Sequence, residues 1–254
     1  MFKNKFLPSL IILFLFFALS GCAPVTLSPS NEIAPMMKGE IPKDNKILVM
    51  SALSNDVLLV NTSGFKWHKN VYTIADIGIN SQVSNTIKKT LNEQGYKNIV
   101  IKKLPANNPL NQQAIQTTDS EFTSTLMYSG SSRGELTKNT QNYLSNILGK
   151  NKSIDDIVFV TAEGQAHVVK ADKETTNLIS GYIIYIVDAH NFNILTWMYD
   201  EIDDLTPGNP VLLSNDPQQI KPALVTLLKL ANKKLQPMVA NTMKTMVTNV
   251  STRW

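Results

Sequence analysis

Apolar residues of this chain gather in short runs separated by polar turns, a pattern typical of alternating strands and helices. The runs 46–53 and 57–61 flank Ser54-Asn55-Asp56, whose turn chemistry predicts a β-hairpin. The stretch 62–73 is then predicted to be a long loop or a third strand.

Helical spacing begins after this stretch. Apolar residues recur every four positions from Val83 to Leu91, which predicts a helix over 80–94 that Gly95 ends in a left-handed cap. A strand over 98–102 follows, and a strand, a helix and a strand in this order indicate a crossover unit.

The second half of the chain repeats the alternation. A second amphipathic helix is predicted over 135–148, and a core strand over 157–162. The long apolar segment 178–187 and the segment 193–199 predict another hairpin, with its turn at 188–192.

The last predicted helix spans 218–235, where leucines and alanines form a wide apolar face. Pro237 is expected to break or kink it, because proline lacks the amide hydrogen and clashes with the preceding turn. A shorter helical tail that contains several methionines is expected to follow.

These elements predict one α/β (α+β-like) domain over 46–254, with a mixed sheet of about five to seven strands. Three main helices are expected to pack mostly on one face of that sheet. The length of 254 residues, 43% of them hydrophobic, suits a single domain of this kind. The polar segment 103–120 and the stretch 62–73 are the surfaces expected to bind partners.

The N-terminal segment has the organisation of an export signal. Lys3 and Lys5 precede an apolar run over 10–19, which is too short to remain in a bilayer as a spanning helix. Small residues come next and end at Cys22, the one cysteine of the chain. Residues 1–21 are therefore predicted to be a signal peptide.

Leu19-Ser20-Gly21-Cys22 resembles the lipobox of bacterial lipoproteins, and the resemblance covers residues 1–23. It implies cleavage before Cys22, a diacylglyceryl group on that cysteine, and a further fatty acyl chain such as palmitate on the new amino terminus. Ala23 in place of aspartate implies, by the sorting rule of enteric members, the periplasmic face of the outer membrane. The expected location is thus the cell envelope.

Between the predicted anchor and the domain, residues 22–45 contain four prolines and no regular apolar period. This composition predicts an extended tether, which reaches about 25–70 Å depending on its stiffness. Such a tether lifts the domain clear of the lipid headgroups.

The net charge is +4, and two of the basic residues lie in the predicted signal peptide. The near balance that remains gives no electrostatic case for nucleic acid and little for anionic lipid. Four lysines of the last predicted helix either meet an anionic surface or form a solvated face; they are Lys221, Lys229, Lys233 and Lys234.

Gly130-Ser131-Ser132-Arg133-Gly134 matches the G-x-S-x-G pattern of a nucleophile elbow. Ser132 would then be the nucleophile of a lipid-anchored hydrolase, with His190 as its base and Asp156 or Asp188 as the orienting carboxylate. The alternative is a Gly/Ser turn that caps the helix starting near Glu135.

A second cluster of candidate residues surrounds the 178–199 hairpin and its exit. Hard oxygen ligands, or these with a histidine, can hold a metal ion; the candidates are Asp188, His190, Asp200, Asp203 and Asp204. The alternative is a solvated hairpin turn followed by an acidic loop before Pro207-Gly208. No phosphate loop, dinucleotide fingerprint or CxxC motif is present, so no cofactor is predicted.

The sequence therefore predicts a membrane-anchored periplasmic lipoprotein that acts as a non-catalytic binding or adaptor module for a cell-envelope complex. Its expected partners are an envelope protein or the cell wall, and not nucleic acid. The alternatives are a serine hydrolase that uses Ser132 and a metal- or solute-binding module at Asp188–Asp204.

Overall fold

The computed structural model describes residues 41–62, 67–74, 77–104, 136, 138–149, 153–162 and 166–251, with side chains up to 248. All of them belong to one unit, which spans Asn31–Trp254. The strands are β1 (Lys46–Ser51), β2 (Asp56–Asn61), β3 (His68–Thr73), β4 (Asn98–Ile101), β5 (Asp156–Thr161), β6 (His167–Ala171), β7 (Thr175–Asp188) and β8 (Ile194–Pro207). The helices are α2 (Ile79–Glu93), α5 (Lys138–Leu148), the 3-10 helix η1 (Pro210–Leu213) and α6 (Pro217–Ser251).

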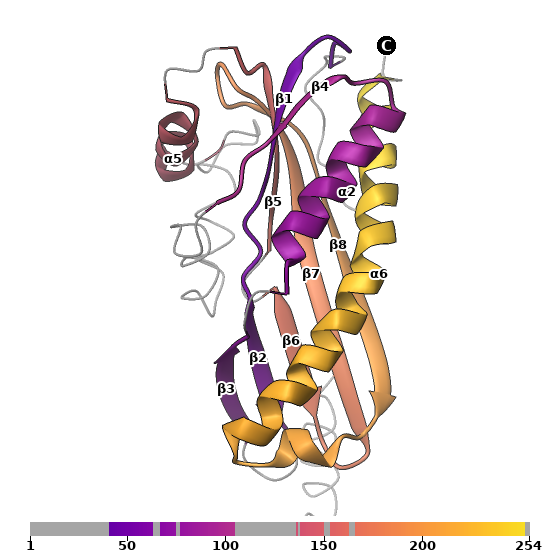
Figure 1. Cartoon of the computed structure of the whole chain (residues 1–254). Helices are drawn as coiled ribbons and strands as arrows, with labels where there is room; N and C mark the ends of the chain where they lie inside the picture. Colours follow the sequence, from indigo (N-terminus) through magenta and orange to yellow (C-terminus); the bar gives the residue numbers. More distant parts are fainter. Residues whose placement is uncertain are drawn as a thin grey trace, which may run out of the picture. The chain divides into compact units, whose positions relative to one another are not determined.

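The eight strands form one mixed sheet in the order β3-β2-β6-β7-β5-β1-β4, and β8 pairs with the other side of β7. The long strand β7 pairs through its first half with β6 and through its second half with β5, so β5 and β6 lie end to end (Figure 1). The predicted α/β class with a mixed sheet is therefore confirmed. The sheet has one strand more than the predicted upper limit of seven.

The predicted hairpin between the first two strands is wrong. β1 pairs in parallel with β4 and β5, whereas β2 pairs in parallel with β6 and antiparallel with β3. β1 and β2 are thus successive parts of one line of strand, interrupted at residues 52–55. Ser54 does provide turn chemistry, because its Oγ accepts the amide hydrogen of Asp56 at 3.0 Å, but the turn displaces the strand without reversing it.

The crossover is confirmed only in part. β1 and β4 are parallel neighbours and α2 crosses one face of the sheet before β4, but β2 and β3 also lie between β1 and α2 in the chain. The strand directly before α2, β3, pairs with β2 and not with β4. Val83, Ile87 and Leu91 of α2 are fully buried, as their spacing predicts. Gly95 has a φ of 95°, the left-handed conformation expected just after the helix.

Two hydrophobic layers hold the domain together. On one face of the sheet, α2 and α6 cover residues such as Val49, Val160 and Ile184. On the other face, α5 covers a smaller cluster that includes Phe159 and Tyr185, whose rings stack at 6.5 Å. The expectation that the helices pack mostly on one face holds for α2 and α6.

The last helix continues through Pro237, so the prediction of a break there is wrong. α6 is one helix of 35 residues, with both Pro222 and Pro237 inside it. Leu235, Val239 and Met243 are buried on either side of Pro237 and pack in the same core. Burial of this continuous apolar face outweighs the local cost of the missing hydrogen bond.

The predicted acidic loop before Pro207 is part of strand β8. Pairing with β7 extends through Asp200, Asp203 and Asp204, opposite Tyr182, Ile179 and Leu178 respectively. Acidic residues have low strand propensity, but pairing along the whole of β7 overrides it here.

Candidate functional site

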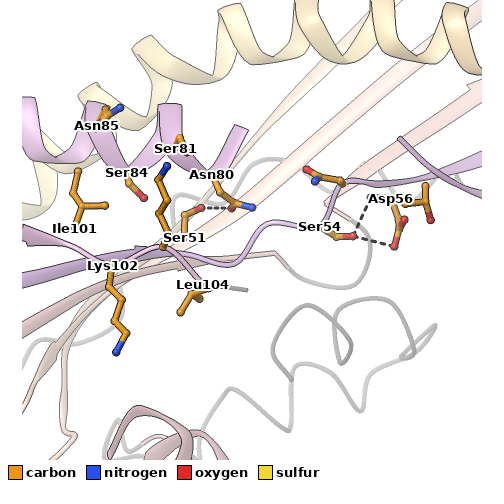
Figure 2. Close-up of a pocket in the computed structure, with 13 residues that line it drawn as sticks. Ser51, Ser54, Asp56, Asn80, Ser81, Ser84, Asn85, Ile101, Lys102 and Leu104 are labelled. Atoms are coloured by element: carbon orange, nitrogen blue, oxygen red, sulfur yellow. Dashed lines mark hydrogen bonds between the residues drawn. The ribbon is translucent and has the colours of Figure 1, made fainter. Parts of the chain in front are cut away.

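A cavity of about 600 Å³ lies where the line of β1 and β2 is interrupted. It opens at the carboxyl ends of the parallel strands β1 and β4, beside the first turns of α2 (Figure 2). This is the edge at which open α/β sheets bind their ligands. The residues around it are mostly hydroxyl and carboxamide side chains, namely Ser51, Ser54, Asn55, Thr73, Asn80, Ser81, Ser84 and Asn85. The carboxylate of Asp56 also lines it, with Ile101, Lys102, Lys103 and Leu104 from the end of β4.

Asn80 holds the interrupted strand in place. Its Oδ1 accepts the Leu53 amide hydrogen at 2.9 Å, and its Nδ2 donates to the Leu53 carbonyl at 2.8 Å. The Ser51 hydroxyl donates to the same Oδ1 at 2.6 Å, the contact drawn as a dashed line in Figure 2. The side chain thus satisfies backbone groups that leave the strand ladder, and it makes a fixed wall of the cavity.

Asp56 is the one carboxylate of the described lining, and it is only 7% exposed. The Ser54 hydroxyl donates to its Oδ2 at 3.2 Å. Among the described residues, no donor reaches Asp56 Oδ1 or the nearby Asn55 Oδ1, and both atoms are buried. Buried acceptors without a donor are costly. Both oxygens are closed to solvent as the wall stands, so a ligand N–H or O–H group would reach them only after a shift of the lining.

Two lysines belong to the opposite side of the cavity, Lys102 and Lys103. Lys102 Nζ donates to the carbonyl of Ile147 at 2.8 Å and so ties the end of β4 to the last turn of α5. The described lining holds no histidine or cysteine, the residues most often used as base or thiol nucleophile. Its polar groups are hydroxyls, carboxamides, one carboxylate and two ammonium groups.

Ser132 and Cys22 lie outside the described residues. The other hydrolase candidates meet at one end of the sheet, where Asp156 and Asp188 are partners in the β5–β7 register. Asp188 does not orient the ring of His190, because its Oδ1 accepts from the main-chain amide of that histidine at 2.7 Å and closes the turn. The imidazole Nε2 lies 3.5 Å from Asp155 Oδ1 instead.

The same end of the sheet contains a buried carboxylate, Asp156, which is 4% exposed. Burial raises the pKa of Asp156, and the nearby Asp188 and Asp155 raise it further, whereas the hydrogen bond from Asn45 lowers it. Asn45 Nδ2 donates to Asp156 Oδ2 at 2.7 Å, and Asp155 accepts the Lys46 amide hydrogen at 2.8 Å. These contacts tie the entry of β1 to β5.

The metal candidates are not brought together. Asp200 Oδ2 accepts from Thr242 at 3.2 Å, and Asp204 forms an ion pair with Lys234 at 2.7 Å, so both face α6. Asp203 is exposed on the opposite face, since side chains alternate along a strand. Asp188 and His190 lie at the turn, well along the strands from these three. Within the described part of the chain, no three His, Cys, Asp or Glu side chains are grouped to hold a metal ion.

The sequence patterns did not single out Asn80 or Asp56 as site residues. The predicted crossover unit gave a partial signal, because the carboxyl ends of the strands of such a unit are where ligands bind. It did not identify β1 as the parallel neighbour of β4. His167 was also missed as part of a strand. It is 2% exposed, its Nδ1 lies 2.9 Å from Ser180 Oγ, and burial lowers its pKa to about 4.

None of the described helices has the length and apolar composition needed to cross a membrane. A scan against models of protein families gives no match, and a search of curated proteins gives none either.

Solved structures do match, at low similarity. Protein XCC0632 from Xanthomonas campestris, of family DUF330, is 9% identical over 86% of this chain and 97% of its own, with a TM-score of 0.39. A PelC variant dodecamer from Paraburkholderia phytofirmans is 8% identical over 84% and 95%, with a TM-score of 0.36. Lipoprotein GNA1162 from Neisseria meningitidis is 12% identical over 73% and 96%, with a TM-score of 0.30. At these scores the likeness carries no argument about function.

Proposed function

We propose that this chain is a lipid-anchored protein of the cell envelope whose α/β domain binds a partner without catalysis. The cavity at the interruption between β1 and β2 is its binding site. The partner presents hydrogen-bond donors, such as the hydroxyl, amide or amino groups of an envelope protein or of the cell wall.

The observation that carries the proposal is the buried carboxylate of Asp56 in a wall of hydroxyl and carboxamide groups. A carboxylate oxygen and a carboxamide oxygen that lack donors among the described residues favour a ligand that supplies them. Asn80 keeps the wall in one conformation, which lowers the entropic cost of binding.

The lipobox supports the location. Acylation of Cys22 would confine the domain to a thin layer next to the membrane, and the tether over 22–45 would set its reach. Confinement raises the effective concentration of any partner in the same layer, so a modest intrinsic affinity is sufficient.

A site-specific cross-linking experiment tests the proposal. A photo-reactive amino acid replaces Asn85, an exposed residue at the cavity, and in a control chain it replaces Glu174, which is exposed in the turn between β6 and β7. Irradiation of intact cells is expected to give a discrete cross-linked product from position 85 and none from position 174. Asp56→Asn is expected to reduce that product, with circular dichroism as the check that the variant is folded.

Equal products from positions 85 and 174, or no product from position 85, would remove the cavity as the binding site. A product from position 85 that Asp56→Asn leaves unchanged would remove Asp56 from the site.

A further inference from the structure

One surface of the domain is strongly cationic. α2 and α6 lie side by side over the sheet (Figure 1), and Gln82 joins them by accepting hydrogen bonds from Asn232 Nδ2 at 2.7 Å and Gln236 Nε2 at 2.5 Å. Seven lysines of the two helices are exposed, and one carboxylate, Glu93, accompanies them. The lysines are Lys88, Lys89, Lys221, Lys229, Lys233, Lys234 and Lys244.

Few of these lysines have a counter-charge. Glu93 is shared between Lys89, at 4.0 Å, and Lys244, at 3.6 Å, while Lys234 pairs with Asp204 of β8. The other four form no ion pair with any described residue. α6 itself contains no aspartate or glutamate along its 35 residues, so its lysines lack partners on their own helix.

The positive charge is unevenly distributed along the chain, although the net charge of the whole chain is small. The whole chain carries +4, of which the two leader lysines account for two charges and the helices α2 and α6 for six. The remaining residues are therefore net negative together, and the positive charge is concentrated on the helical layer.

Three of the lysines lie on the same side of α6. At 100° per residue, Lys229, Lys233 and Lys244 fall within about 60° of one another around the helix axis. Leu230 lies beside them and is 46% exposed. Lysines next to an exposed aliphatic side chain are the combination that interfacial helices use on lipid headgroups.

We propose that the outward surface of α2 and α6 docks on an anionic lipid surface. The lysine ammonium groups contact lipid phosphates, and Leu230 enters the headgroup region. The proposal rests on the proposed function for one point, that the domain is held near a membrane; it is independent of the cavity. Docking would fix the orientation of the tethered domain, which the lipid anchor alone would leave free.

The test uses the mature chain, residues 22–254, with Cys22→Ala so that no acyl group contributes. Binding is measured by co-sedimentation with vesicles of phosphatidylglycerol and phosphatidylcholine, and with vesicles of phosphatidylcholine alone. The test variant is Lys229→Gln/Lys233→Gln. The matched control is Lys69→Gln/Lys173→Gln, which removes the same charge from exposed positions outside the two helices.

We expect binding to the anionic vesicles only, with affinity that falls as sodium chloride rises from 50 to 500 mM. The test variant should bind about thirtyfold more weakly, and the control variant should bind like the parent.

Three results would overturn the proposal. They are no binding to anionic vesicles, equal binding to both kinds of vesicle, and an equal loss in the test and control variants. Retention on an anionic polysaccharide without vesicle binding would also overturn it and would indicate a polyanionic partner of another kind. Asn85 lies between Lys88 and Lys89 around the axis of α2, so Asp56→Asn is the variant that separates the two proposals. It is expected to reduce the cross-link from position 85 and to leave vesicle binding unchanged.

Discussion

The carboxamide of Asn80 pairs with the main chain of Leu53 through two hydrogen bonds, one to the amide and one to the carbonyl. The pairing has the pattern of a strand neighbour, supplied by a side chain from the first turn of α2. It satisfies the amide and carbonyl groups of Leu53 just after β1 ends. The Asn80 side chain also forms one wall of the candidate site.

Asn80→Ala is expected to lower the free energy of unfolding by about 2–4 kcal/mol, because it leaves two backbone groups and the Ser51 hydroxyl without partners. Urea unfolding followed by circular dichroism measures the change. Asn85→Ala is the control, since Asn85 is exposed on the same helix, and its effect should stay within about 0.5 kcal/mol. Equal effects of the two substitutions would show that the pairing with Leu53 contributes nothing.

His167 makes stability depend on pH. Burial lowers its pKa to about 4 from an ordinary value of 6.5, so the unfolded chain binds this proton more tightly than the folded chain. The stabilisation is fully present above pH 6.5 and is lost as the pH falls toward 4. The lowering of the pKa from 6.5 to about 4 corresponds to a change of about 3 kcal/mol in the free energy of unfolding.

Unfolding free energies of the parent and of His167→Gln between pH 4 and 7.5 test this assignment. The difference between the two proteins should change with pH by about 3 kcal/mol or less, in the direction that favours the variant in acid. His68→Gln, at an exposed position of β3, is the matched substitution. A constant difference between parent and His167→Gln would rule out the buried histidine as the cause.

Pro237 lies inside a continuous helix, where it lacks an amide hydrogen to donate. Pro237→Ala is therefore expected to raise the free energy of unfolding by about 1–3 kcal/mol. Thermal and urea unfolding measure the change. Pro217→Ala, at the first residue of α6, should give no such gain, because proline is well tolerated at that position. No gain from Pro237→Ala would indicate that the helix is interrupted there after all.

Binding without catalysis predicts that Ser132 is not an activated nucleophile. The chain should remain unlabelled by a fluorophosphonate probe, and Ser132→Ala should not change the cross-linking from position 85. Probe labelling of the parent that disappears in Ser132→Ala, with the fold intact, would favour the hydrolase instead.

The helices and the buried strands were predictable because their signals are local. Val83, Ile87 and Leu91 of α2 and the apolar run of β5 are buried as their spacing requires. The class of the fold follows from the order of such elements. The error at Ser54 has a different origin, since turn chemistry does not specify whether a strand reverses or only shifts. The partner that decides it, Asn80, is 27 residues away from Leu53.

Long-range packing accounts for the other differences. α6 passes Pro237 because Leu235 and Val239 both reach the core, and β8 keeps its acidic residues in a strand because β7 extends beside them. β6 is short, with His167 and Lys170 among its five residues, and its position is determined by β2 and β7. The cavity depends on the same tertiary contacts, so sequence patterns alone did not locate it.

The proposed role of the domain depends on its attachment to a membrane through Cys22. Mass spectrometry of the N-terminal peptide of the protein isolated from cell membranes tests this attachment. We predict a peptide that begins at Cys22 and carries a diacylglyceryl group and an amide-linked acyl chain, and we predict that no such peptide is recovered from Cys22→Ala. An N-terminal peptide that retains residues 1–21, or an unmodified Cys22, would contradict the claim.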